Sequence, residues 1–538
     1  MRDFHLPGRS TVHAASGMCA ASHPFAARAA VDILDRGGNA ADAAIAAAVL
    51  LGICEPQMAG LGGDAFALVQ PAPDAPVVAL NGSGRAPARL DAEVLRGRGL
   101  AAMPVDEPAA VTIPGAVDLF CRLSSEWGRM GLAPVLAPSI RYASQGVPVG
   151  PRTAFDWALA QDRLRGRARE LYLSAGVPPG VGQLFRAPGQ AEVLRLVVER
   201  GRAGFYEGPV AEDIVASLRA LGGAHTEDDL AASTCDASDP IFGPIEGMEL
   251  VEHPPNGQGA TALLLAAILA RHDPGSDPFS ARRIHLEAEA ARLAYAVRDR
   301  VVGDPGRVKD LDRMLDPATA DRLVALIDPA RAMADPVAAA AEALGAPARP
   351  RAPADVHRET VCLSVVDRDR MAVSLIYSIF HSFGSGIATD RFGILLQNRG
   401  AGFALEPGHP NEAAGGRRPL HTIIPAMLRA QGRTVAAFGV MGGAYQPVGH
   451  VRVVQNVLRH GMNPQEALDA PRSFADGPVL MVERGYPDAV RADLAAMGHD
   501  VRIPETPLGG AQMVMIDEPE GTLLGASDPR KDGCALGI

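Results

Sequence analysis

The most constraining feature of this chain is a threonine at the start of an apolar, alternating segment. Residues 359–367 read Glu-Thr-Val-Cys-Leu-Ser-Val-Val-Asp and follow a stretch rich in proline and alanine. A polar turn at residues 367–370 and a second apolar run at residues 371–379 come next, which is typical of a β-hairpin. Thr360 is therefore expected to open the first strand. Because β-branched residues are common in strands, these residues alone leave a purely structural role open.

A backbone cut before Thr360 would change the chemistry of this residue. A threonine hydroxyl is a weak nucleophile until a base lies beside it, and the α-amino group freed by the cut would be such a base. The reference pKa of an α-amino group is about 8, so part of the population accepts a proton at neutral pH. Such a cut would make Glu359 and Thr360 the cleavage site, with Thr360 as the nucleophile.

Ordered sequence blocks on both sides of Thr360 resemble the gamma-glutamyltransferase (glutathione hydrolase) family of N-terminal-nucleophile hydrolases. They extend over nearly the whole chain and include residues 37–40 (Gly-Gly-Asn-Ala), 113–116 (Ile-Pro-Gly-Ala), 205–208 (Phe-Tyr-Glu-Gly), 415–420 (Gly-Gly-Arg-Arg-Pro-Leu) and 527–530 (Ser-Asp-Pro-Arg). The resemblance implies an α+β fold, a four-layer αββα sandwich formed by two chains cut from one precursor. The expected fragments are a large subunit, residues 1–359, and a small catalytic subunit, residues 360–538.

The resemblance also assigns the other catalytic residues. Gly442 and Gly443 occupy the positions of the family's Gly-Gly pair, and two backbone N–H groups aimed at an oxyanion are a strong source of transition-state stabilisation. Ser378 aligns with a threonine that hydrogen-bonds the amine of the nucleophile, and it keeps the hydroxyl. Without the resemblance, the glycines are an ordinary tight turn and Ser378 is a strand serine. The family implies no metal and no organic cofactor.

The substrate-binding blocks depart from the family. The arginine that binds glutamate in the family lies in a block matched here by residues 81–87, and Ser83 stands in its place. A hydroxyl cannot replace a bidentate arginine–carboxylate contact. Arg85, two positions on, could take over this role, or it is simply a surface arginine. Gly402 falls where the family has the aspartate that holds the substrate's α-ammonium group, and Arg399 replaces a nearby neutral glutamine.

These departures change the substrate expected. The pocket has lost an anion for an ammonium group and gained a cation, unless Arg399 is merely a solvated surface arginine. His421 and Thr422 replace a pair of serines and keep the capacity for hydrogen bonds. The pattern resembles the branch that includes oxamate amidohydrolase. We expect amide hydrolysis or acyl transfer through an acyl-threonine ester, acting on a short carboxylated acyl group such as oxamate.

Three alternatives stay open at this point. The first is a true gamma-glutamyltransferase or glutathione hydrolase, in which Arg85 and His421 rebuild the recognition of glutamate. The second is an amidase similar to cephalosporin acylase. The third is a scaffold or binding protein that does not process itself, which the presence of Thr360, Gly442 and Gly443 makes less attractive.

Composition agrees with an enzyme that binds small molecules. The chain has 538 residues, 47% of them hydrophobic, which is enough for a large core. Its formal charge of −11 argues against a general binder of nucleic acid or anionic membrane. The partners implied by the resemblance are a small amide substrate and, for each fragment of the precursor, the other fragment. Six scattered cysteines without a CxxC pair indicate neither a zinc ribbon nor a disulfide framework.

Two further segments bear on location and maturation. Residues 1–16 lack the apolar core of a secretory signal, and the apolar run at residues 43–53 is too short to cross a bilayer, so a cytoplasmic location is expected. Residues 331–359 are rich in alanine, proline and arginine, which predicts an irregular, flexible connector before the cut. In residues 284–301, charged residues alternate with apolar ones at helical spacing and predict a solvated helix face.

Overall fold

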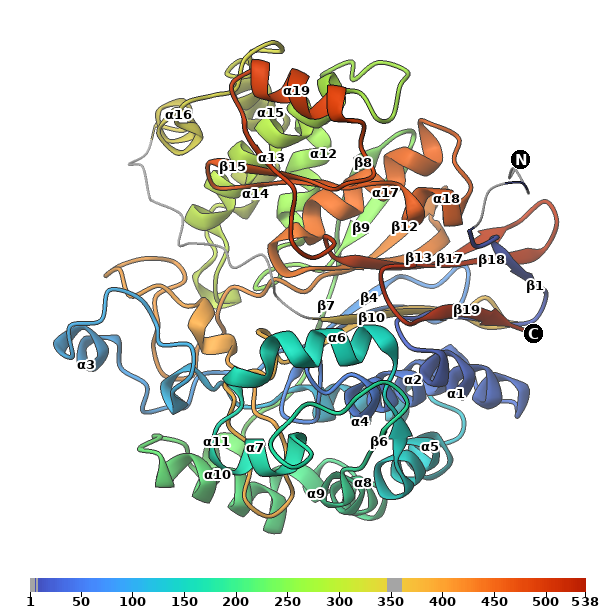
Figure 1. The fold of residues 1–538 in the computed structure, drawn as a ribbon, viewed down its shortest axis with the longest axis vertical. Coiled ribbons are helices and arrows are strands. Elements are labelled where there is room, and N and C mark those ends of the chain that lie inside the picture. The colour runs from blue at the N-terminus through green and yellow to red at the C-terminus, as the bar shows by residue number, and fades with distance from the viewer. Residues whose placement is uncertain (1–4, 6–7, 346–359) are drawn as a thin grey trace.

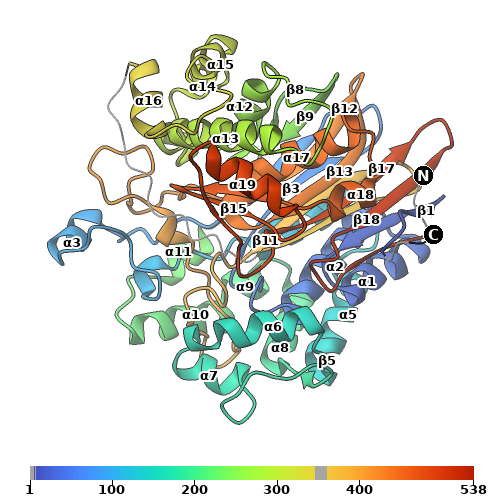
Figure 2. The ribbon, with the colours of Figure 1, turned by 45° about the horizontal axis from the view of Figure 1, so that its top comes forward.

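The computed structural model describes residue 5, residues 8–345 and residues 360–538. Two seven-stranded sheets stack face to face in the middle of the molecule, and helices cover the outer face of each (Figure 1). Turning the molecule by 45° shows the same order of helix, sheet, sheet and helix (Figure 2). The predicted αββα sandwich is therefore confirmed.

The first sheet has β13 (Arg433–Met441), a strand from the C-terminal part of the chain, at its centre. Its order is β1 (Val12–Ala14), β18 (Thr522–Ser527), β17 (Gly510–Asp517), β13 (Arg433–Met441), β12 (Pro425–Ala430), β9 (Met248–Glu252) and β8 (Ile241–Ile245). Every pairing within it is antiparallel. A bulge between Leu428 and Arg429 shifts the register of β12 against β13.

The second sheet carries the predicted hairpin at its centre. Its order is β19 (Cys534–Gly537), β2 (Met18–Ala21), β10 (Val361–Val366), β11 (Ala372–Ser378), β3 (Asp64–Gln70), β4 (Val78–Gly82) and β7 (Asp236–Ser238). Two small sheets lie outside the sandwich: β14 (Ser473–Asp476), β15 (Val479–Val482) and β16 (Asp500–Arg502), and the pair β5 (Val147–Pro148) and β6 (Leu184–Phe185).

The helices form two groups, one on each sheet. The second sheet is covered by the N-terminal group, of which α2 packs on β10 and β11: α1 (Pro24–Asp35), α2 (Ala40–Cys54), α4 (Ala116–Trp127), α5 (Leu132–Gln145) and α8 (Pro188–Arg200). The first sheet is covered by α12 (Gly259–Leu269), α13 (Ala281–Val301) and α17 (Gln446–Leu458).

The remaining helices lie around these two layers (Figure 1). They are α3 (Ala92–Gly97), α6 (Pro151–Ala160), α7 (Gly166–Tyr172), α9 (Ala203–Tyr206), α10 (Pro209–Ala220), α11 (Glu227–Ala231), α14 (Leu311–Leu315), α15 (Pro317–Val324), α16 (Pro336–Ala343), α18 (Pro464–Asp469) and α19 (Asp488–Ala496). Short 3-10 turns occur at η1 (Pro108–Ala110), η2 (Gln161–Arg163), η3 (Pro305–Arg307), η4 (Arg399–Gly402) and η5 (Gly443–Tyr445). Within the described ranges, every helix is either too short or too polar to traverse a lipid bilayer.

A side chain in the turn fastens the predicted hairpin to the helical layer. Asp367 Oδ1 accepts the N–H groups of Asp369 and Met371, which closes the turn between β10 and β11. Its other oxygen accepts the N–H of Ala40 at the start of α2. Burial of this hairpin between two layers explains why both strands are apolar on both faces.

The connector differs in part from the prediction. Residues Pro336–Ala343 form helix α16 instead of an irregular segment, because Asp335 caps the helix, Pro336 suits its first turn and alanines favour helix. Glu359 belongs to residues 346–359, which lie outside the described part of the chain. Flexibility of the connector stays a prediction.

The prediction of a solvated face on α13 is wrong. Arg283, Glu287, Glu289 and Arg292 are all buried. They are paired with one another, Arg283 with Glu287 at 2.8 Å and Arg292 with Glu289 at 2.9 Å. Helical spacing of charges identifies one face of a helix, but it does not tell whether that face meets water or a second layer of the protein.

Candidate active site

Thr360 lies at the end of the central hairpin, beside the last residue of its second strand. The register pairs Val361 with Tyr377, so Thr360 is opposite Ser378. The hydroxyl of Thr360 donates to Ser378 Oγ at 3.4 Å, and both residues are buried. Ser378 Oγ in turn accepts the N–H of Phe380 at 2.9 Å. The structure thus places Ser378 beside Thr360, and the hydrogen bond predicted between Ser378 and the amine of the nucleophile stays a prediction.

Gly442 and Gly443 form a sharp turn where β13 passes into η5 and α17. Their φ angles are +114° and +57°, a region in which a side chain is strained and glycine is not. The contacts that hold the turn use its carbonyl oxygens: Gly442 O accepts from Tyr445 N–H, and Gly443 O accepts from Gln258 Nε2 at 3.0 Å. Backbone N–H groups are what an oxyanion requires.

This glycine turn and Thr360 lie at the same end of the sandwich. Cys362 Sγ is 3.3 Å from the carbonyl oxygen of Gly439, so β13 crosses over β10. Met441, the last residue of β13, packs in the same buried cluster as Cys362. Since β10 begins just after Thr360 and β13 ends just before Gly442, the nucleophile and the turn face one another across the two sheets.

A buried carboxylate, Asp64, completes this end of the second sheet. It opens β3 and is paired with Ser378 in the ladder. Its Oδ1 accepts the N–H of Gly84 at 2.8 Å, the N–H of Gly115 at 3.2 Å and the amide of Gln397 at 2.8 Å. Burial of a carboxylate is costly unless hydrogen-bond donors surround it, as they do here.

His421 supplies the fourth donor to Asp64. Its Nε2 lies 3.1 Å from Asp64 Oδ2, while its Nδ1 accepts the N–H of Ile423 at 3.3 Å. The proton of the ring is therefore on Nε2. Burial raises the pKa of Asp64 to about 6, against the opposing effect of Arg399. Burial, followed by the charge of Arg399, holds the pKa of His421 well below its usual range, so this ring stays neutral at physiological pH.

Arg399 is a completely buried cation within this cluster. It has no exposed surface, its Nη1 donates to Thr422 Oγ1 at 3.0 Å, and its guanidinium lies 3.8 Å above the ring of Phe380. Phe380 is two residues after Ser378. The interpretation of Arg399 as a solvated surface residue is therefore wrong. Thr422 lies beside it, and the role of Arg399, His421 and Thr422 in substrate binding stays a prediction.

Arg85 does not join the cluster. Its guanidinium reaches Asp236 at 3.4 Å and the carbonyl oxygen of Gly416 at 3.2 Å. The side chain is 40% exposed. It lines a separate surface cavity of about 460 Å³ together with residues of the 226–233 segment. Of the two arginines that sequence reasoning left open, the structure brings only Arg399 into contact with Phe380 and Thr422.

Ser83, which stands at the position of the family's arginine, is held in a local network. Its hydroxyl donates to Asn81 Oδ1 at 2.6 Å and accepts from Asn256 Nδ2 at 3.2 Å. Its carbonyl oxygen accepts from Arg418 Nε at 2.8 Å. Arg418 is also buried and pairs with Asp236. Because the donors of Arg418 are aimed at protein acceptors, this second buried arginine stabilises the loop.

Sequence reasoning missed three members of this site. Asp64 follows a glycine pair at the start of an apolar strand, and a carboxylate in such a position was a usable signal. Gln258 and Arg298 lie far away in sequence: Arg298 Nη1 donates to Gln258 Oε1 at 2.7 Å, and Gln258 Nε2 donates to the carbonyl oxygens of Thr422 and Gly443. No local pattern could connect them to the glycine turn.

Comparisons with known proteins agree with this geometry. The model of the gamma-glutamyltranspeptidase family matches residues 26–538. The glutathione hydrolase-like YwrD proenzyme of Bacillus subtilis is 34% identical, with 97% of this chain and 98% of that protein covered. The oxamate amidohydrolase proenzyme of Klebsiella pneumoniae is also 34% identical, with the same coverage. The crystal structure of cephalosporin acylase from Bacillus halodurans superimposes with a TM-score of 0.90 at 34% identity, covering 100% of this chain and 99% of that one.

Proposed function

The chain belongs to the gamma-glutamyltranspeptidase family and is an enzyme that acts on amide bonds, and from that premise we propose how it matures and what it cleaves. Thr360 Oγ1 attacks the carbonyl carbon of Glu359, and the peptide nitrogen leaves as the α-amine of Thr360. Water then hydrolyses the resulting ester and leaves two fragments. The buried position of Thr360, 3.4 Å from Ser378 Oγ, supports this role.

Turnover uses the amine that maturation creates. The α-amine of Thr360 takes the proton of Oγ1, and Oγ1 attacks the substrate's amide carbon. The N–H groups of Gly442 and Gly443 stabilise the oxyanion, and Ser378 orients the nucleophile. The ammonium group returns its proton to the leaving nitrogen. Water, or another acceptor, then attacks the acyl-threonine ester and regenerates the enzyme.

The acyl group is a short one that carries a carboxylate, as oxamate does. The observation that carries this proposal is the buried cation of Arg399, close to the hydroxyl of Thr422 and the ring of Phe380. A buried guanidinium makes strong, directional bonds to a carboxylate. With oxamate, the products would be oxalate and ammonia. The oxamate amidohydrolase of Klebsiella pneumoniae is among the relatives at 34% identity.

The same cluster is poorly suited to the α-ammonium group of a glutamyl substrate. Gly402 provides no carboxylate, and its carbonyl oxygen already accepts from Asn411 Nδ2 at 2.6 Å. Asp64 is the buried acid nearby, but its oxygens accept from Gln397, His421 and two backbone N–H groups. A carboxylate with its lone pairs filled in this way has little left for an ammonium group.

A longer carboxylated acyl group is the second candidate. It is favoured by the likeness of the whole chain to the cephalosporin acylase of Bacillus halodurans, at a TM-score of 0.90. A glutaryl amide would satisfy Arg399 in the same way as oxamate, with more methylene groups between the carboxylate and the scissile bond. Both candidates share the carboxylate and lack the α-amine.

A pair of anilides tests the proposal with one group changed. Glutaryl p-nitroanilide and gamma-glutamyl p-nitroanilide differ only in the α-amine, and oxamate provides the short acyl group. We expect the processed enzyme to have a higher kcat/KM for oxamate or the glutaryl anilide than for the gamma-glutamyl anilide. Efficient gamma-glutamyl turnover, without activity on either acid amide, would overturn the proposal in favour of a glutathione hydrolase.

A further inference from the structure

A large cavity lies next to α13, outside the residues assigned to the Thr360 site. It has a volume of about 610 Å³ and is bounded by α13, the 331–337 segment and the turns at residues 477–478 and 497–500. Pockets for small organic ligands measure about 300–1,000 Å³. Much of the lining is apolar, contributed by Tyr295, Ala296, Met333, Val337 and Met497. The size and lining suit an organic molecule better than water.

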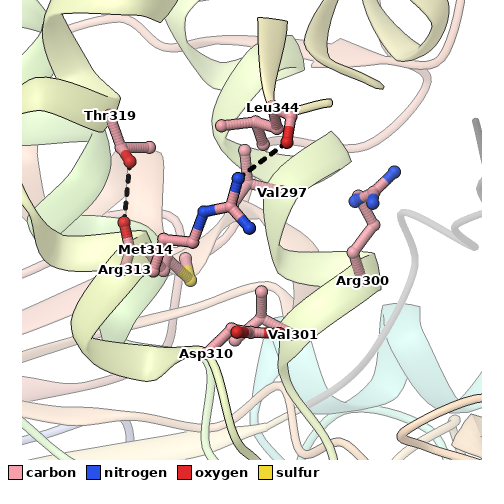
Figure 3. Close-up of a pocket in the computed structure, with 8 residues that line it drawn as sticks. All are labelled: Val297, Arg300, Val301, Asp310, Arg313, Met314, Thr319 and Leu344. Carbon is pink, nitrogen blue, oxygen red and sulfur yellow. Dashed lines mark hydrogen bonds between the residues drawn. The ribbon is translucent and has the colours of Figure 1, made fainter. Parts of the chain in front are cut away.

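A second cavity beside α13 is too small for an organic ligand. It measures about 60 Å³, which is space for a few water molecules. Figure 3 shows how its polar groups bond to protein: Arg313 Nη2 donates to Leu344 O, and Thr319 Oγ1 donates to Arg313 O, each at 2.7 Å. The larger cavity is therefore the one to consider as a binding site.

The charges around the larger cavity favour an anion. Its two acids are already paired with neighbouring arginines, Asp299 with Arg298 at 2.6 Å and Asp500 with Arg502 at 2.7 Å. Arg331 is exposed at the rim, and no carboxylate in the described ranges lies within ion-pair distance of it. The charge left for a ligand to neutralise is therefore positive.

The floor of the cavity is a buried polar network. Arg292 Nη1 contacts Glu289 Oε1 at 2.9 Å and His499 Nδ1 at 3.4 Å; His499 Nε2 lies 2.8 Å from His285 Nδ1, and His285 Nε2 lies 2.8 Å from Asp328 O. Burial, Arg292 and His285 lower the pKa of His499 to about 4, so its ring is neutral. His285, Glu289 and His499 could converge on a metal ion, but a guanidinium among them opposes a cation.

The wall of the cavity is bonded directly to the glycine turn of the Thr360 site. The hydroxyl of Tyr295 donates to the carbonyl oxygen of Ala444, which follows Gly443. Asp299 also holds Arg298, whose guanidinium donates to Gln258, and Gln258 holds the carbonyl oxygen of Gly443. Tyr295, which lines the cavity, is thus bonded directly to the turn. Asp299, which also lines it, is connected to the turn through Arg298 and Gln258.

We propose that this cavity is a second, non-catalytic binding site for an amphipathic organic anion, a carboxylate on an aromatic or alkyl body, and that its occupancy changes turnover at Thr360. The carboxylate meets Arg331 at the rim, and the apolar body lies against Tyr295 and Met333. The effect on turnover rests on the role proposed above for Gly443. Binding does not, so the two parts can fail separately.

Calorimetry with 1-naphthylacetate and 1-naphthylmethylamine tests the binding, because the two probes share a ring and differ in charge. We expect the processed wild-type enzyme to prefer the anion. Arg331→Glu should weaken its binding about tenfold, the size expected for reversing one exposed charge, and Ala296→Phe should weaken it by filling the cavity. Arg307→Glu, an exposed arginine elsewhere, is the matched control. Equal affinity for both probes, or unchanged affinity in Arg331→Glu, would overturn the site, as would displacement of the anion by Zn²⁺.

Activity of the same proteins tests the coupling. Saturating 1-naphthylacetate should change the kcat for an amide substrate in the wild type and in Arg307→Glu, and it should have a weaker effect in Arg331→Glu at the same probe concentration. If the anion binds but changes neither kcat nor KM, the coupling is wrong. If the enzyme cleaves no amide at all while the anion still binds, the proposed reaction has failed and the binding site has not.

Discussion

Two buried polar clusters of this molecule use their charges in different ways. Around Thr360, Asp64 and Arg399 lie at the end of the sandwich, and His421 donates a hydrogen bond to Asp64. On α13, Glu289 and Arg292 form a direct ion pair at 2.9 Å, and histidines continue the network. In the proposed mechanism the first cluster directs polar groups at the bond that is cleaved, whereas the second neutralises its own charges and borders a cavity.

The difference teaches where to look for chemistry. A buried ion pair is costly to form and is weak evidence of function by itself. What separates the two clusters is the environment: only the first includes a hydroxyl at the start of a strand and a glycine turn with positive φ angles. Variants that remove one group at a time should therefore affect catalysis strongly in the first cluster and weakly in the second.

The largest effect is expected at Thr360. Thr360→Ala removes the hydroxyl that cuts the backbone, so the protein should remain one chain and be inactive. Thr360→Ser keeps a hydroxyl and should be cut at least in part. Intact-mass measurement identifies the fragments, with Thr360 expected as the new N-terminus. Wild-type protein that is fully uncut yet active would overturn the mechanism.

The glycine turn comes next. Gly443→Val places a β-branched residue at a φ of +57°, which should displace a backbone donor and lower kcat by roughly two orders of magnitude or more. Gly461→Val is the matched control, because Gly461 has a φ of +65° and open space around it. It imposes similar strain far from the site. Near-normal turnover of folded, processed Gly443→Val would remove this residue from the oxyanion site.

Replacement of Arg399 should lower kcat/KM more than replacement of Arg85. Arg399→Gln removes the buried cation and should lower kcat/KM for a carboxylated amide by about 30-fold, in line with the loss of a charge-assisted hydrogen bond. Arg85→Gln should change it less than about threefold, because an exposed ion pair contributes little. Steady-state kinetics of both variants on oxamate and the glutaryl anilide decide the matter. A larger effect of Arg85→Gln than of Arg399→Gln would indicate that the substrate's carboxylate binds at Arg85, beside Asp236.

The raised pKa of Asp64 predicts that substrate binding depends on pH. Its pKa is raised to about 6, so the acid is neutral below that pH and ionised above it. The ionised form repels a carboxylated substrate and competes for Arg399, so the KM of such a substrate should rise as pH increases through about 6. Meanwhile kcat should increase toward about pH 8, where the α-amine of Thr360 becomes a free base.

Asp64→Asn isolates the first of these effects. In this variant the KM should no longer depend on pH between 5 and 8, and at pH 8 it should be about tenfold lower than in the wild type, since repulsion between partly buried charges is worth more than 1 kcal/mol. An amide with an uncharged acyl group is the control substrate. If its KM shows the same pH dependence as that of oxamate, Asp64 does not act on the substrate's charge.

The hairpin, the position of Thr360 and the glycine turn could be predicted from short-range patterns, and the sandwich could be predicted from the resemblance to a family. The alternation of residues 360–379 gave the hairpin, and ordered motif blocks gave the sandwich and its family. The glycine pair at residues 442–443 predicted a turn. The signals for the hairpin and the turn lie within a few residues of these features, whereas the blocks that imply the sandwich extend over nearly the whole chain.

The rest depended on contacts between distant segments. Arg399 lies at the site because η4 packs against the end of β11. The residues that flank Arg85 and Arg399 in sequence do not reveal this packing. The burial of the charged face of α13 follows from its cover by β14–β16 and α19. Helix α16 lies in a segment whose proline-rich composition indicates irregular structure, although Asp335 provides a helix cap there.

The smallest effect is expected where the two clusters meet. Asp299 lines the α13 cavity and holds Arg298 at 2.6 Å, and Arg298 positions Gln258 against the carbonyl oxygen of Gly443. Asp299→Asn keeps the shape but removes the charge, so Arg298 should hold Gln258 less firmly and kcat should fall about threefold, a loss of roughly 0.6 kcal/mol. KM should not change, because no substrate contact is touched. Asp500→Asn is the matched control, an acid on the same cavity whose partner Arg502 is exposed. Equal kinetics for both variants would show that the two clusters are independent.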